Sequence, residues 1–193
     1  MTYASKTAPL PATVIAYHIP AQRSADTAAL NIVETLLGRG PSSRLRVALV
    51  DGGLASQVAA NADTRQQPGL FFVYAIANGG KSTHDLEAAL EQQVARLREP
   101  VSPAELDKAK TQTIAALVRS LETHDNVAQA LVRAAVIDGD PSAVNREAPG
   151  YVRVSAADVQ RVARTYLTTN NSTVVAYEVA AAPAAPAATG APK

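Results

Sequence analysis

Four stretches of the chain have the short apolar or alternating pattern that is typical of strands. The stretches are Thr13 to Ile19, Leu54 to Ala62, Gly69 to Asn78 and Thr173 to Val179. The third stretch is apolar on both faces, which favours a central strand. It follows the second stretch after a short polar connection, so we expect these two strands to pair.

Between these stretches apolar residues recur every three or four positions, which predicts amphipathic helices. The stripe of the first helix consists of Ala29, Ile32, Val33, Leu36 and Leu37. Ser24 is in place to cap this helix, and Gly38 with Gly40 is expected to end it. Residues 41–50 then predict a short second helix.

The clearest helix start is Ser102-Pro103-Ala104-Glu105. It combines a hydroxyl cap, a proline at the first helical position and a carboxylate that we expect to bond back to the cap. The helix that follows is predicted to end near Leu121. Three other helices are predicted over residues 82–97, 126–137 and 155–167.

The order of these elements is strand, helices, two adjacent strands, a run of helices and a final strand. It predicts an α+β domain in which a mainly antiparallel twisted sheet is covered by helices on one face. Residues 1–9 are assigned as a lead-in segment and residues 10–179 as a single domain. Residues 180–193 contain only Ala, Pro, Thr, Gly and a final Lys, so a disordered tail is predicted.

Composition excludes several classes of protein. Lys and Arg number 18 against 17 Asp and Glu, so the concentrated positive field of a nucleic-acid binder is not expected. Cysteine is absent, which excludes disulfides and thiolate metal sites. No apolar run approaches the roughly 20 residues of a membrane span, and the N-terminus lacks signal-peptide features. The pattern begins abruptly at a strand, so we expect an excised segment of a longer protein whose targeting signal lies elsewhere.

Residues that carry chemistry are few. His18, His84 and His124 have no second ligand at helical spacing, so each is interpreted as a surface histidine. No serine lies in a nucleophile elbow, and the glycines near Pro41 match no phosphate-binding loop, so independent hydrolase activity is not expected. The candidate contacts with another domain or a substrate lie on the short second helix and are Ser42, Ser43, Arg44 and Arg46.

Several segments together resemble later domains of the insulinase/pitrilysin zinc peptidases. Leu36 to Leu45 resembles the family segment LLGxGxSSRL. Val101 to Lys110 is similar to VTxxELxxAK, and Val154 to Ala163 is similar to VTxxDVxxVA. The segments follow one another in the family order from about Pro9 to Val179.

The resemblance implies a processing-peptidase-like domain that pairs with others around an unfolded peptide. The family's zinc motif, His-x-x-Glu-His, belongs to an earlier domain, so zinc is expected in a missing N-terminal part of the parent and none in this segment. Many later domains contribute an arginine and a tyrosine in LRxxxGLAY. The corresponding stretch here, one residue shorter, has Val50 and Ser56 at those positions, which implies an inactive domain.

We therefore expect a noncatalytic C-terminal domain of a zinc metalloendopeptidase, which forms part of the peptide-enclosing chamber and the interdomain interface. Its expected partners are the metal-bearing domain or subunit and the peptide substrate of the parent. The alternative is a structural or docking domain of a metal-free relative. The resemblance and the Ala/Pro tail together favour a bacterial, periplasmic parent.

Overall fold

The computed structural model describes residues 1–5 and 9–180, and their strands form one sheet in the order β1-β5-β2-β4-β3. The strands are β1 (Thr2–Ser5), β2 (Ala12–Ile19), β3 (Ala55–Asp63), β4 (Gly69–Ala77) and β5 (Ser172–Val179). β1 pairs with β5 in parallel, and the other three pairings are antiparallel. The mainly antiparallel sheet is therefore confirmed. The predicted tail, except Ala180, lies outside the described residues.

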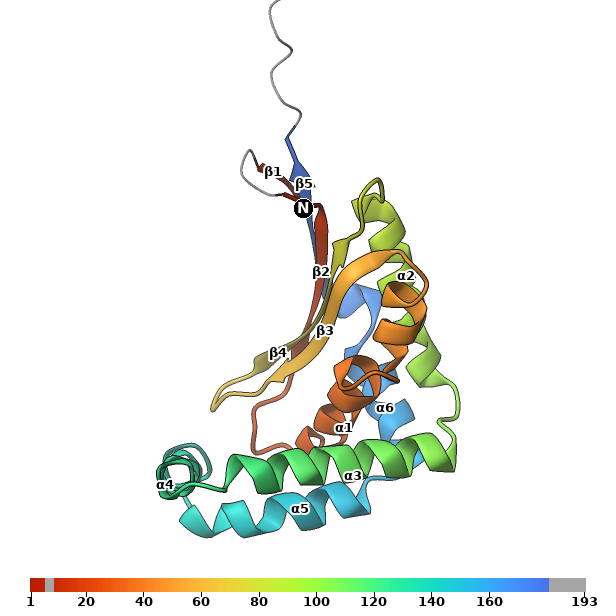
Figure 1. The fold of residues 1–193 in the computed structure, drawn as a ribbon. Coiled ribbons are helices and arrows are strands. Elements are labelled where there is room, and N and C mark those ends of the chain that lie inside the picture. Colours follow the sequence, from red (N-terminus) through yellow and green to blue (C-terminus); the bar gives the residue numbers. More distant parts are fainter. Residues whose placement is uncertain (6–8, 181–193) are drawn as a thin grey trace, which may run out of the picture.

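The helices lie on one face of the sheet, as predicted (Figure 1). They are α1 (Thr27–Gly38), α2 (Thr83–Ala95), α3 (Pro103–Ser120), α4 (His124–Arg133), α5 (Val144–Arg153) and α6 (Ala156–Tyr166). The short helical turns are η1 (Arg46–Val50), η2 (Arg96–Arg98), η3 (Ala134–Asp138), η4 (Pro141–Ala143) and η5 (Thr169–Asn171). α1, α2 and α6 contact the strands, whereas α3 packs mainly against α1 and α5 packs against both α3 and α1. None of the described helices is both long and apolar enough to cross a membrane.

The core lies between the sheet and the helices, on what we call the covered face. Ile15, Phe71 and Val73 point to this face from β2 and β4, and each is fully buried. The predicted stripe of α1 is buried against them throughout. Burying an aliphatic or aromatic side chain of this size stabilises a fold by about 1.5–3 kcal/mol. The apolar faces of the helices and of the strands therefore pack together in one hydrophobic layer.

The other side of the sheet, which we call the open face, has no helix over it (Figure 1). The side chains of the neighbouring strands form rows across this face. The rows are Tyr177-Ala12-Ile76-Gln57, Val175-Val14-Tyr74-Ala59 and Thr173-Ala16-Phe72-Asn61. Most of these side chains are half-buried by their neighbours, and Val175 keeps 37% of its surface exposed. The open face is thus an apolar and aromatic surface that no element of the described residues covers.

Capping boxes begin α2 and α6. The hydroxyls of Ser82 and Ser155 accept from the backbone N–H of Asp85 and Asp158, and both aspartates bond back. Ser102 caps α3 in the same way, but Glu105 does not bond back to it, which corrects that prediction. The Glu105 carboxylate instead accepts two hydrogen bonds from the guanidinium of Arg44.

The start of α1 and of the second helix also differ from the predictions. Ser24 does not cap α1, because its hydroxyl oxygen accepts the N–H of Asp26 and the helix begins only at Thr27. The second helix begins at Arg44 rather than near Pro41, and it continues as the π-helical turn η1. In both places residues that the apolar pattern assigned to a helix form a turn instead.

Two elements were not predicted. β1 lies inside the lead-in segment, where its register with β5 places Tyr3 opposite Tyr177. α5 was missed because Pro149 lies inside it. Proline removes a helical hydrogen bond and disfavours the helix interior. Tyr151 of α5 is buried and its hydroxyl accepts from Asn31 of α1 at 3.0 Å, so packing against α1 supports this helix.

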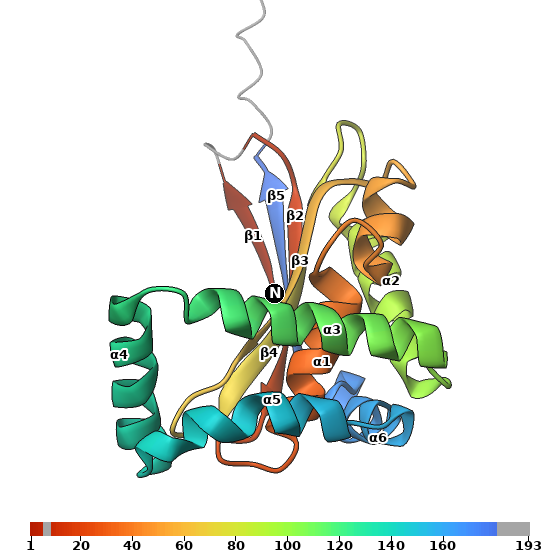
Figure 2. The same ribbon diagram turned by 60° about the horizontal axis from the view of Figure 1, so that its bottom comes forward.

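α4 occupies an unexpected position at the far end of α3, where it turns back toward α5 (Figure 2). Its apolar spacing predicted a helix, and this prediction is confirmed, but no residue of α4 is buried. Leu131 keeps 42% of its surface exposed and Val132 keeps 63%. The helical period is present, but no other described element covers the helix.

Candidate functional site

The segment that links α1 to η1 passes close to β3. A Cβ atom added at Gly38 would lie 2.5 Å from the backbone nitrogen of Ala60. Gly40 has a φ of +82°, which L side chains rarely adopt. Close packing against β3 therefore explains Gly38, and the left-handed backbone explains Gly40. Both agree with the interpretation of these glycines as the end of the helix.

Arg44 forms a two-pronged ion pair inside the domain. Its Nε and Nη2 atoms donate to the two carboxylate oxygens of Glu105 at 2.7 and 2.8 Å. This guanidinium holds the pKa of Glu105 below its ordinary value, against the opposing effect of burial. The side chain of Arg44 is only 17% exposed. Its donor fork is thus largely occupied within the domain, where it ties the second helix to α3.

Ser42 and Ser43 differ in their surroundings. The exposed hydroxyl of Ser42 accepts a hydrogen bond from the Nζ of Lys108 on α3. Ser43 is buried, and among the described residues its hydroxyl has no hydrogen-bond partner. Its carbonyl oxygen accepts from the N–H of Val47 at 3.0 Å. Both serines therefore hold the turn in place through contacts within the chain.

Arg46 is exposed and lines a hollow of about 360 Å³ beside β3. Val50 and Ser56, the two positions at which the family resemblance predicts an arginine and a tyrosine, line the same hollow. The Ser56 hydroxyl lies 3.3 and 3.4 Å from the carbonyl oxygens of Ile76 and Ala77. The described residues give Arg46 no ion pair. The hollow therefore offers one cationic side chain that can bind a carboxylate or carbonyl oxygen.

The outer edge of β3 is only partly available beside this hollow. The backbone N–H of Ala62 on that edge donates to the carboxylate of Glu34 at 3.1 Å. Gly38 lies against Ala60, two residues earlier. By the alternation of an antiparallel strand, Val58 also directs its backbone groups outward, and it lines the hollow. The uncovered part of this edge is therefore the part nearest Arg46.

The residues of this domain do not fit a zinc site. His18, His84 and His124 lie exposed on β2, α2 and α4, which confirms their interpretation as surface histidines. Among the described residues, no group of three or more His, Asp or Glu side chains is arranged to hold a metal ion.

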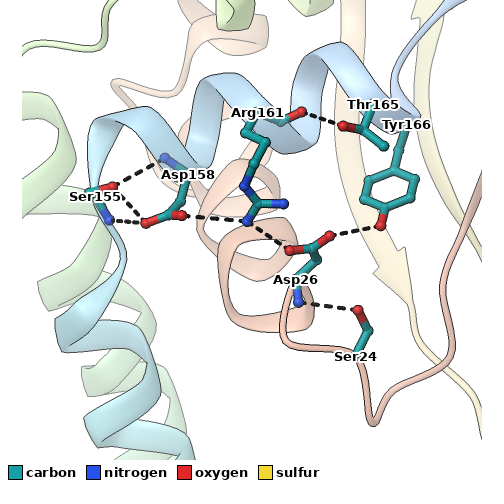
Figure 3. A network of polar contacts seen from close by, with 7 residues as sticks. All are labelled: Ser24, Asp26, Ser155, Asp158, Arg161, Thr165 and Tyr166. Atoms are coloured by element: carbon teal, nitrogen blue, oxygen red, sulfur yellow. Dashed lines mark hydrogen bonds and ion pairs between the residues drawn. The ribbon is translucent and has the colours of Figure 1, made fainter.

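A polar network that was not predicted joins the start of α1 to α6 (Figure 3). One carboxylate oxygen of Asp26 lies 2.7 Å from Nη2 of Arg161, and the other accepts from the hydroxyl of Tyr166 at 2.7 Å. Arg161 also reaches Asp158 of the capping box at 3.4 Å. These bonds to Arg161 and Tyr166 hold the pKa of Asp26 below its ordinary value, although burial opposes them. The network is structural, because each member bonds to another within the fold.

Asp26→Asn should therefore lower the free energy of unfolding by about 1–2 kcal/mol at about pH 7, because it removes a charged acceptor whose partner is half exposed. A carboxyl group with a lowered pKa stabilises the fold above its unfolded pKa and loses this effect as pH falls through the folded value. The difference between wild type and variant should therefore vanish in acid. Denaturant titration across pH measures it, with exposed Asp107→Asn as control. A difference that is constant with pH would contradict the assignment.

Comparison with known proteins agrees with this architecture. Residues 2–113 match the family model described as the peptidase M16 inactive domain. The zinc protease PqqE of Helicobacter pylori is 29% identical over 163 residues, which cover 83% of this chain and 36% of that protein. The chain thus spans about a third of the length of this curated relative.

Two solved structures are similar throughout the fold. A protease from Helicobacter pylori has a TM-score of 0.85 and 27% identity, over 92% of this chain and 43% of that chain. An inactive peptidase domain from Bordetella parapertussis has a TM-score of 0.82 and 26% identity, over 97% of this chain and 98% of that one. The predicted resemblance is confirmed, and the chain belongs to the peptidase M16 inactive domain family of zinc proteases.

Proposed function

We propose that this domain is a noncatalytic wall of a peptide-enclosing chamber in a zinc metallopeptidase. The observation that carries the proposal is the one-sided sheet (Figure 1). Its open face has rows of apolar and aromatic side chains that no helix of the described residues covers. Contiguous exposed apolar patches often mark sites of interaction. A chamber supplies water-filled space in which such a surface contacts a substrate.

The hollow beside β3 supports a second part of this proposal, contact with a peptide or with a neighbouring domain. Of the candidate contacts Ser42, Ser43, Arg44 and Arg46, only Arg46 combines exposure with a free donor fork among the described residues. Its guanidinium lies beside the uncovered edge of β3. We assign Arg46 to hold a carbonyl or carboxylate oxygen of the bound chain.

Catalysis in this proposal belongs to a metal-bearing domain or subunit outside the chain. The family match and the zinc protease relative support a zinc-dependent parent. The bacterial source of that relative, with the Ala/Pro-rich C-terminal sequence, supports a periplasmic location. The polar donors and acceptors of this chain serve to position a peptide rather than to activate water.

Reconstitution of the chain with the metal-bearing domain of its parent tests the proposal. Zinc should bind to that domain, and cleavage of an unfolded peptide should require both parts. Arg46→Ala should raise KM about fivefold, equivalent to about 1 kcal/mol at an exposed site. Arg119→Ala, an exposed arginine on α3, should leave KM unchanged.

Two results would oppose the proposal. Cleavage by the metal-bearing domain alone at the full rate would remove the role of this domain, and cleavage by this chain alone would show that it is catalytic. If the other part of the parent binds no zinc and the two parts still associate, the domain serves docking in a metal-free relative.

A further inference from the structure

The turn that follows β4 contains a reactive pair of residues, Asn78 and Gly79. Asn78 is the only asparagine of the chain that precedes a glycine. A glycine has no Cβ to shield its backbone nitrogen, and it lets the backbone bend toward the preceding side chain. The backbone nitrogen of the next residue can then reach the side-chain amide carbon. The sequence therefore places the asparagine that is most open to this attack in the turn after β4.

The backbone of this turn leaves the nitrogen of Gly79 accessible. The N–H of Lys81 donates to the carbonyl oxygen of Asn78 at 3.1 Å, which closes a β-turn over residues 78–81. Gly80 has a φ of +79°, as the third residue of a type II turn requires. Gly79, the second residue, is exposed, and no backbone carbonyl of the described residues accepts from its N–H. A Cβ atom at Gly79 would meet nothing within 4 Å, so the space around it is open.

Asn78 also connects the end of β4 to the turn after η1. Its backbone N–H donates to the carbonyl oxygen of Leu54, and its side-chain Nδ2 donates to the carbonyl oxygen of Gly53, both at 3.0 Å. The two acceptors belong to the turn between Val50 and Ser56, which line the hollow beside β3. A chemical change of the Asn78 side chain therefore acts on the turn beside this hollow.

We propose that Asn78 is a site of spontaneous deamidation and that this modification loosens the turn at Gly53. The backbone nitrogen of Gly79 attacks Cγ of Asn78, and the new C–N bond closes a five-membered succinimide ring. The bond from Cγ to Nδ2 breaks, and Nδ2 leaves as ammonia with the proton of the Gly79 N–H. A water molecule then adds to one of the two ring carbonyls and opens the ring to aspartate or isoaspartate. The reaction needs no oxidant or reductant, and it is independent of the chamber function.

The product cannot repeat the side-chain contact with Gly53. A carboxylate has no hydrogen to donate, so two oxygen acceptors would face each other where Nδ2 of Asn78 now donates. Isoaspartate also adds a methylene group to the backbone of the turn. In the intact protein this hydrogen bond restrains the amide, so we expect the attack to follow local opening of the turn. Once modified, the turn stays loosened, because the donor has been lost.

Peptide mapping by mass spectrometry of the full chain, incubated at mildly alkaline pH, tests the chemical step. Asn78 should convert about tenfold faster than exposed Asn170, which is followed by Asn171, a difference of about 1.4 kcal/mol in activation free energy. Gly79→Ala should slow the conversion of Asn78 about tenfold, because the added methyl group shields the nitrogen. This variant isolates the chemistry, since its Cβ meets nothing within 4 Å. Equal rates at Asn78 and Asn170, or an unchanged rate in Gly79→Ala, would overturn the proposal.

Asn78→Asp reproduces one product and tests the loosening of the turn. The N–H groups of Gly53 and Leu54 donate to carbonyl oxygens within the turn, so their hydrogen exchange reports its opening. Exchange over residues 50–54 should become about fivefold faster, the factor expected for one lost hydrogen bond. Asn170→Asp is the matched control and should leave exchange over residues 50–54 unchanged. Equal exchange in the two variants would show that the modification leaves the turn intact, against the proposal.

Discussion

Phe71→Ala is expected to lower the free energy of unfolding by about 3–5 kcal/mol, the range for a large aromatic side chain removed from a packed core. Phe71 is fully buried on the covered face of β4, where the helices enclose it. The loss combines the transfer of the ring to water with the cavity left behind. Urea titration followed by circular dichroism measures it.

Phe72→Ala is the matched control, since the same change is made at the next residue of the same strand. Phe72 points to the open face and is only half-buried by Ala16 and its other neighbours. We expect a loss of about 1 kcal/mol or less. Equal losses in the two variants would mean that both faces of the sheet are packed, and the one-sided architecture would be wrong.

Gly38→Ala is expected to lower the free energy of unfolding by about 1–3 kcal/mol, although alanine favours helices more than glycine does. The added Cβ would lie 2.5 Å from the backbone nitrogen of Ala60, and backbone cannot move away as a flexible side chain can. α1 and β3 would have to separate. Because Arg46 lies at the same junction, the hollow beside β3 should change shape, and the KM of the reconstituted peptidase should rise.

Gly79→Ala provides the comparison for this substitution. A Cβ at Gly79 meets nothing within 4 Å, and its φ is outside the left-handed region. We expect a change within about 0.5 kcal/mol, with a slight gain if the unfolded chain loses freedom. Thermal and urea unfolding of both variants measure the difference. A Gly38 variant as stable as the Gly79 variant would show that α1 does not closely contact β3.

The regular elements could be predicted because their signal is local. The alternation along β2 and the stripe of α1 each put apolar side chains on one side of a regular backbone. The helices predicted over residues 82–97 and 155–167 both begin with a capping box, which depends on residues only three positions apart. These patterns depend on local geometry alone, and the tertiary structure preserves them.

The candidate site was less predictable, because its side chains bond to partners that are distant in sequence. Glu105 was expected to bond back to its own helix start, yet Arg44, 61 residues away, offers a charged two-pronged partner. A charge-assisted pair is stronger than a bond to a neutral backbone N–H, so it prevails. Among the described residues Arg46 has no ion pair, and it lines one hollow with Val50 and Ser56.

The sequence by itself determined the strands β2 to β5, most of the helices and the family, because periodicity, caps and motifs are properties of neighbouring residues. Only the tertiary structure decided which face of each strand is covered, that β1 joins the sheet beside β5, and that α4 is left without a core. These outcomes depend on contacts between residues far apart in the chain. An apolar pattern indicates that a side chain prefers burial, but it does not indicate which other element covers that side chain.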